Sequence, residues 1–98
     1  MTYVDDLAAA VRAELAAEDR PSSRGDELFR LYALLALVSG TETTLEDVHD
    51  AWSVWMSASD PEHPSLVPFG SLPASTQAQD RPFQEAIVRV ARRLERRH

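Results

Sequence analysis

The segment from Asp60 to Pro73 constrains the fold of this chain more than any other, because it holds four prolines and one glycine. A proline fixes its own φ and pushes the preceding residue toward extended geometry, so residues 60–73 cannot form a regular helix. Between the prolines lie three apolar residues, Leu66, Val67 and Phe69. We therefore predict an ordered strap that lays these side chains across a helical core.

On both sides of the strap, apolar residues recur with helical spacing. The stripes are Val4–Leu7–Val11–Leu15, Leu45–Val48–Trp52–Trp55 and Phe83–Ile87–Val90–Leu94. Thr2 and Thr44, each with an aspartate three residues on, can cap the first and third helices, and Asp80 can cap the last. Residues 20–25 break the first helix, and a short turn is expected after Pro73. The pattern predicts an all-α domain over residues 1–98, with four helices, the first of them at 2–19.

The second helix is expected to begin near Asp26 and to end at Gly40, a residue suited to a left-handed stop. It is apolar almost all round, with Arg30 as its only interior charge. Such a helix is either central to the core or partly an oligomer face. We expect its residues Leu31, Leu34, Leu35 and Val38 to be almost inaccessible, and we expect a symmetric homodimer.

Composition excludes several classes of protein. The 98 residues contain no cysteine, so neither a disulfide framework nor a thiolate zinc site is available. The longest apolar run, residues 31–38, is far shorter than the roughly 20 residues of a membrane span, and no signal peptide is readable. We expect a soluble, cytoplasmic protein without a membrane partner.

The net charge of −6 is unevenly distributed. Residues 1–62 hold thirteen acids and four arginines, which gives −9, whereas residues 63–98 hold three acids and six arginines, which gives +3. Binding to duplex nucleic acid depends on neutralising phosphates, so an acidic chain argues against it.

No catalytic motif is visible. The chain has no Gly-x-Ser-x-Gly elbow, no phosphate-binding loop and only three glycines, so we expect a protein that is not an enzyme. Glu46 and His49 have the spacing of a di-iron ligand pair, but such sites need a second pair, which the sequence lacks. We expect no metal and no cofactor.

Two motifs carry a resemblance to a known family. Val48-His49 with Trp52, followed by His63-Pro64-Ser65-Leu66-Val67-Pro68-Phe69 and Leu72-Pro73, resembles the signature of the ryanodine-receptor (RyR) repeat domain over residues 45–92. The first half, with LYALLAL and TLEDVHDAW, is similar to small uncharacterised proteins of actinobacteria and their phages. The chain departs from the RyR pattern where only ten residues separate Trp52 from His63 and where Gly70 replaces an acid. The resemblance implies a helical module associated with sensing of nucleotide signals.

Two functions follow as hypotheses. In the first, a nucleotide-type signal binds between the strap and the helices. Trp55 or Phe69 would stack on its base, His49 and His63 would line the pocket, and an arginine would take its phosphate. The candidate arginines are Arg81, Arg89 and Arg92.

In the second hypothesis, the chain is an interaction or structural module without a small ligand. The same residues then have structural roles. His49 is a hydrogen-bonded core histidine, the strap only covers apolar surface, and the C-terminal arginines pair with the acidic N-terminal half. In both hypotheses we expect Trp52 in the core and Trp55 more open.

Overall fold

The computed structural model describes residues 2–16 and 25–96, and the described residues form helices and no strands. Four long helices are present: α1 (Tyr3–Ala13), α2 (Gly25–Val38), α3 (Leu45–Ser57) and α5 (Arg81–Arg96). Three short elements join them: η2 (Gly40–Glu42), η3 (Phe69–Ser71) and α4 (Ala74–Ala78). The predicted all-α fold with four helices is confirmed, and the turn expected after Pro73 is the five-residue helix α4.

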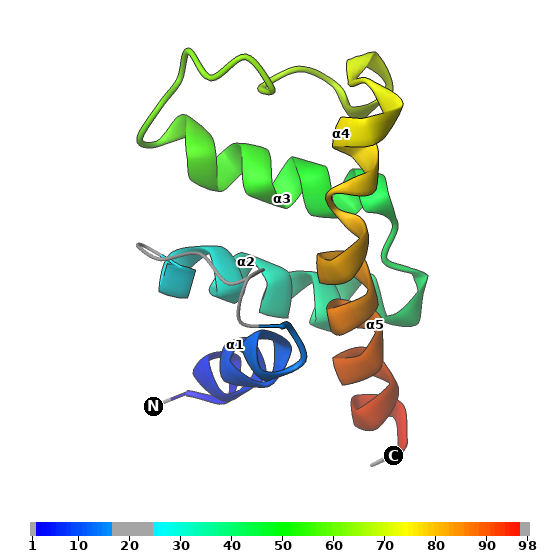
Figure 1. Cartoon of the computed structure of the whole chain (residues 1–98). Coiled ribbons are helices and arrows are strands. Elements are labelled where there is room, and N and C mark those ends of the chain that lie inside the picture. The colour runs from blue at the N-terminus through cyan, green and yellow to red at the C-terminus, as the bar shows by residue number, and fades with distance from the viewer. Residues whose placement is uncertain (1, 17–24, 97–98) are drawn as a thin grey trace.

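The helices are stacked in a simple order (Figure 1). α2 lies between α1 and α3, α2 and α3 run in opposite directions, and α5 passes across the stack on one side. The strap, residues 60–73, returns over the outer side of α3 and leads into α4 and then α5. The radius of gyration is 13.1 Å, which is the value for a tightly packed chain of this length.

The ends of the helices follow local chemistry. Thr2 and Thr44 accept hydrogen bonds from the backbone N–H groups of Asp5 and Asp47, and each aspartate reaches back to the capping residue. Both predicted capping boxes are therefore confirmed. Gly40 stops α2 with a φ of +60°, a conformation that glycine adopts without strain. α1 ends at Ala13, earlier than predicted, and residues 17–19 and most of the expected break lie outside the described residues.

The core lies where α1, α2 and α5 meet, and it is built from small and medium apolar side chains together with Phe29 and Tyr32. Val11, Ala33 and Ile87 have no exposed surface. Gln84 connects α5 to the segment between α2 and α3, because its side-chain amide donates a hydrogen bond to the Thr43 carbonyl at 3.1 Å.

The predicted buried face of α2 is wrong. Leu34 is 52% exposed and Val38 is 74% exposed, while Leu31 and Leu35 are half-buried. The buried residues are Leu28, Phe29, Tyr32, Ala33 and Ala36. An all-round apolar sequence does not specify which side faces the core, and here α1, α3 and α5 pack against the side that carries the alanines and aromatic rings. None of the helices in residues 2–16 and 25–96 is long and apolar enough to span a membrane.

Candidate functional site

The strap is attached to the helices through its backbone carbonyls. Nε2 of His49 on α3 lies 2.7 Å from the carbonyl oxygen of Val67. The side-chain amide of Gln77 on α4 donates to the carbonyls of Phe69 and Leu72, at 3.0 and 3.1 Å. These bonds satisfy backbone carbonyls of the strap and add to the few hydrogen bonds that it forms within itself, such as the one from the Leu72 N–H to the Phe69 carbonyl. The strap is therefore held in place at its middle and at its end.

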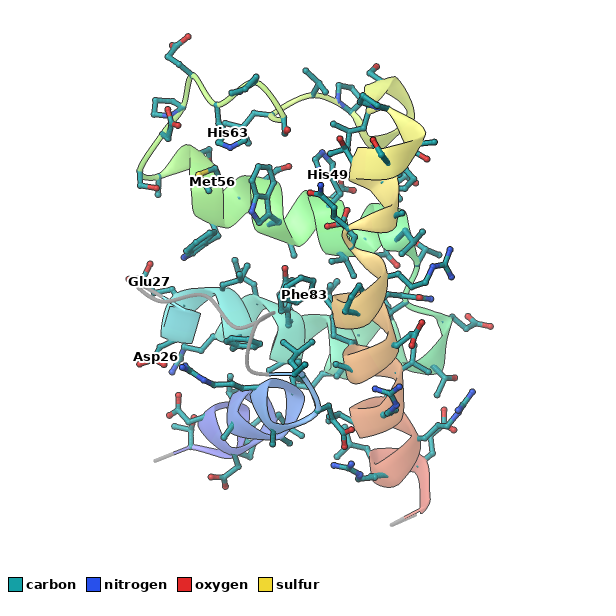
Figure 2. All side chains as sticks on the ribbon, in the orientation of Figure 1. Asp26, Glu27, His49, Met56, His63 and Phe83 are labelled. Carbon is teal, nitrogen blue, oxygen red and sulfur yellow. The ribbon has the colours of Figure 1, made fainter. Side chains whose placement is uncertain are left out.

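Beneath the strap lies a cavity of about 360 Å³, which we call the strap cavity. Its size is at the lower end of the range for small-molecule sites. Four aromatic side chains line it: Tyr32, Trp52, Trp55 and Phe83. The polar lining consists of His49, His63, Ser65, Thr76, Gln79 and Asp80, and Leu28 and Leu72 complete it. Figure 2 shows His63 pointing from the strap toward α3, and Phe83 at the beginning of α5.

His49 is only 3% exposed, and its Nε2 must carry a hydrogen because a carbonyl oxygen can only accept. Its ring stacks on that of Trp52 with centroids 5.6 Å apart and contacts Phe69 at 6.1 Å. His49 thus links the strap to α3 and also lines the cavity. Phe69 contacts His49 and is not among the residues that line the cavity.

His63 begins the part of the strap that covers α3. Its Nδ1 accepts a hydrogen bond from the Ser65 backbone N–H at 3.0 Å, so the ring is neutral in this arrangement. The same ring meets Trp52 edge to face at 5.1 Å. Trp52 is half-buried between the two histidines, and Trp55 is half-buried beside the same cavity. The expected division into a core tryptophan and an open one is therefore not seen.

Asp80 precedes α5 and lines the cavity. Burial raises the pKa of its carboxyl group, and the nearby His49 acts in the opposite direction. Tyr32 is 1% exposed, and burial followed by the charge of Asp80 raises the pKa of its hydroxyl. Asp80, His49 and Tyr32 are therefore close enough to influence one another electrostatically.

The candidate arginines do not reach this cavity. Arg89 lies 4.0 Å from Glu14 and 3.5 Å from Glu85, and Arg93 also pairs with Glu14 at the end of α1. Arg81 and Arg89 line a separate, shallow hollow, and Arg92 is exposed on α5. None of the arginines in the described part of the chain lines the strap cavity. Of the predicted site residues, the fold brings together His49, Trp55 and His63.

A family model for a domain of unknown function, DUF7701, matches residues 2–92. The chain belongs to the DUF7701 family. No curated protein and no solved structure matches it. The expected RyR repeat is wrong, since the matching family is DUF7701 and its match begins at residue 2, well before the segment that carried the resemblance. The resemblance rested on short motifs around a histidine and a proline-rich segment, and motifs this short can occur in unrelated families.

Several cavity residues of this DUF7701 chain were not predicted. Tyr32 and Phe83 fall within apolar helical stripes and read as core residues, and Asp80 reads as a helix cap. Gln77, which holds the strap, lies in a segment without any pattern. Asp80, Gln77 and Phe83 lie near α3 because α4 turns the chain between the strap and α5. No group of three histidine or acidic side chains in residues 2–16 and 25–96 could hold a metal ion.

Proposed function

We propose that this protein is a non-catalytic module that binds a small molecule in the strap cavity. The observation that carries the proposal is the cavity itself, in which four aromatic side chains surround a few polar groups. Ligand sites in proteins are typically concave and apolar, with a small number of polar groups that orient the ligand. A core that served stability alone would enclose such large rings, yet Trp52, Trp55 and Phe83 all remain half-buried.

A binding role rather than catalysis is supported by the bonds of the two histidines. Nε2 of His49 is bound to the Val67 carbonyl, and Nδ1 of His63 is bound to the Ser65 N–H. Each imidazole thereby uses one nitrogen to shape the strap. A general base needs an accessible lone pair on nitrogen, whereas the Nδ1 lone pair of His63 already accepts from Ser65 and the His49 ring is only 3% exposed, so these arrangements favour a structural use.

The nucleotide hypothesis drew on the RyR resemblance and loses that support. The geometry favours the stacking half of that hypothesis over the phosphate half, because Arg81, Arg89 and Arg92 lie outside the cavity. We therefore expect adenosine to bind at least as well as its monophosphate. If the phosphate strengthens binding and Arg81→Ala removes that gain, the nucleotide form of the proposal is restored.

The proposal is tested by thermal unfolding in the presence of nucleosides, nucleotides, cyclic dinucleotides and small organic ammonium compounds. A ligand at about 100 times its dissociation constant stabilises the native state by about 2.7 kcal/mol, a rise in Tm of roughly 10 °C or more. Trp55→Leu should abolish the rise, because it removes a ring from the cavity and keeps an apolar side chain. Val54→Ala, on the exposed side of α3, is the matched control. If no compound raises the Tm, the binding proposal is rejected.

A second candidate function is self-association through α2. Leu34, Leu37 and Val38 are exposed on this helix, and Tyr3 of α1 is 69% exposed. Tyr3 and Leu37 line a groove of about 300 Å³ together with Asp6 and Arg93. A surface that carries apolar residues and both signs of charge can meet its own copy across a two-fold axis. Sedimentation should show a dimer that Val38→Glu dissociates, and a 10.9 kDa monomer at high micromolar concentration contradicts this candidate.

A further inference from the structure

The strap cavity has an unbalanced charge. Asp80 is the only acid among the described residues that line it, and the chain has no lysine to add to the arginines that lie elsewhere. His63 is neutral while its Nδ1 accepts from Ser65. Among the described lining residues, His49 is therefore the one group that can carry a positive charge opposite Asp80. When His49 is neutral, these described residues carry the single negative charge of Asp80.

The aromatic walls match this charge. The faces of aromatic rings attract cations, most strongly those of tryptophan, and the attraction grows when water is excluded. Tyr32 and Phe83 lie with their ring centroids 5.6 Å apart, and Trp55 lines the cavity with them. An alkylated ammonium group can pack its methyl groups against such rings and keep its charge near a carboxylate.

The hydroxyl of Tyr32 is a further polar group at the strap cavity. Its side chain is buried, and no described residue forms a hydrogen bond with its hydroxyl. Since no fully buried side-chain oxygen or nitrogen lacks a partner among the described residues, this hydroxyl retains some access, and the strap cavity is the space that Tyr32 lines. A phenol oxygen can accept a hydrogen bond from a ligand N–H or O–H.

We propose that the strap cavity recognises an organic cation, with an ammonium group facing Asp80 and its alkyl groups against the rings of Trp55, Tyr32 and Phe83. This inference rests on the proposed function and specifies the chemistry of its ligand. A phosphate or carboxylate would meet the charge of Asp80, and none of the described lining residues is an arginine. A bare metal ion would lack ligands, because the described residues offer no group of three histidine or acidic side chains.

The test is isothermal titration of the full chain with choline and with dimethylbutanol, the uncharged carbon isostere of choline. Both probes have the same shape, so their difference in affinity measures the response to charge. The wild-type protein should bind choline at least about tenfold more tightly, since bonds to charged groups are typically that strong. Equal binding of the two probes would overturn the inference.

Two variants locate the charge. Asp80→Asn keeps the shape of the side chain and removes its charge, and it should bring the two probes to equal affinity. Asp50→Asn removes the same charge from the exposed side of α3, outside the cavity, and should leave the preference unchanged. A preference for choline that survives Asp80→Asn contradicts the inference.

The remaining outcomes separate this inference from the proposed function. If adenosine or dimethylbutanol binds and choline does not, the cavity is a binding site and the organic-cation inference is wrong. If neither probe nor any nucleoside binds, the proposed function and the inference are rejected together.

Discussion

Two regions of this molecule use apolar residues in different ways. Between α1, α2 and α5, which we call the closed core, Val11, Phe29, Ala33, Ile87 and Val90 are at most 2% exposed. On the strap side of α3, Trp52, Trp55, His63 and Phe69 are all half-buried. The largest rings in the chain are thus placed where they are not fully covered.

This difference indicates which region serves stability and which is available for function. A closed core gains its free energy from the area it removes from water and from tight packing. Half-buried rings gain less free energy from burial, and here they surround a cavity that Asp80 also lines. Substitutions in the two regions should therefore differ in how much they lower stability.

The largest effect is expected in the closed core. Phe29 is 1% exposed and meets Tyr32 edge to face at 5.8 Å. Phe29→Ala should lower the free energy of unfolding by about 3–5 kcal/mol, because it leaves a cavity in a packed region. Trp55→Leu should cost less than half as much. Urea unfolding followed by circular dichroism measures both, and equal losses would show that the strap side is as much a part of the core.

A smaller and more local effect is expected for His49→Ala. The change removes the donor to the Val67 carbonyl and the ring that stacks on Trp52. Losing a buried hydrogen-bond partner should cost about 1–3 kcal/mol. Hydrogen exchange should accelerate at the backbone N–H groups of Leu66 and Leu72 more than in α1. Equal acceleration throughout the chain would mean that His49 supports the whole fold rather than the strap.

Two aspartates, Asp80 beside the cavity and Asp5 at the start of α1, should make stability respond to pH with opposite sign. The pKa of Asp80 is raised by burial, so the native chain holds a proton that the unfolded chain releases. Stability from this group is present at low pH and is lost as pH rises from the ordinary aspartate range through the raised pKa. Over that window the wild-type protein should lose stability relative to Asp80→Asn. Parallel pH profiles would contradict the burial of this carboxyl group.

Asp5 of α1 provides the opposite case. Its pKa is lowered, first by the hydrogen bond from the Thr2 backbone N–H, then by the Thr2 hydroxyl and, less, by Arg30. The stability it contributes is present above the ordinary aspartate pKa and is lost as pH falls through the lowered value. Asp5→Asn should therefore be less sensitive to acid than the wild-type protein, as thermal unfolding between mildly and strongly acidic pH would measure. Unchanged acid sensitivity would argue against the capping box.

The smallest effect is expected on the surface of α5. Arg93→Ala breaks the ion pair with Glu14, and the Arg93 side chain is 55% exposed. Exposed ion pairs contribute about 0–1 kcal/mol and are screened by salt. The loss should therefore shrink further at high ionic strength in urea unfolding. A loss as large as that of His49→Ala would show that α1 is held to α5 mainly by charge.

Local sequence chemistry predicted the helices and the core-facing sides of α1, α3 and α5, but not that of α2. Thr2 and Thr44 can each cap a helix and Gly40 marks a stop, so these helix ends could be predicted. The face of α2 could not, because its apolar residues surround the helix and the choice depends on α1, α3 and α5. The place of Asp80 in the cavity also depends on how α4 turns the chain toward α5.

The candidate site was predicted only in part, for a similar reason. His49, Trp55 and His63 are polar or aromatic residues in a context that drew attention, and they line the cavity. Arg81, Arg89 and Arg92 were predicted from their charge and from their place toward the strap end of the last helix, and α5 directs them away from the cavity. Tyr32 is a core residue and Phe83 has the spacing of one, and only their neighbours across the cavity show that both also line it.

The two tryptophans of the chain can report directly on binding beneath the strap, because both line the strap cavity. A ¹⁵N-labelled protein gives one indole N–H resonance for each, and a small-molecule panel that includes choline and adenosine can be titrated against them. We expect a bound compound to shift both indole resonances and to leave the backbone resonances of α1 unchanged. Indole resonances that stay fixed with every compound would contradict a binding site beneath the strap.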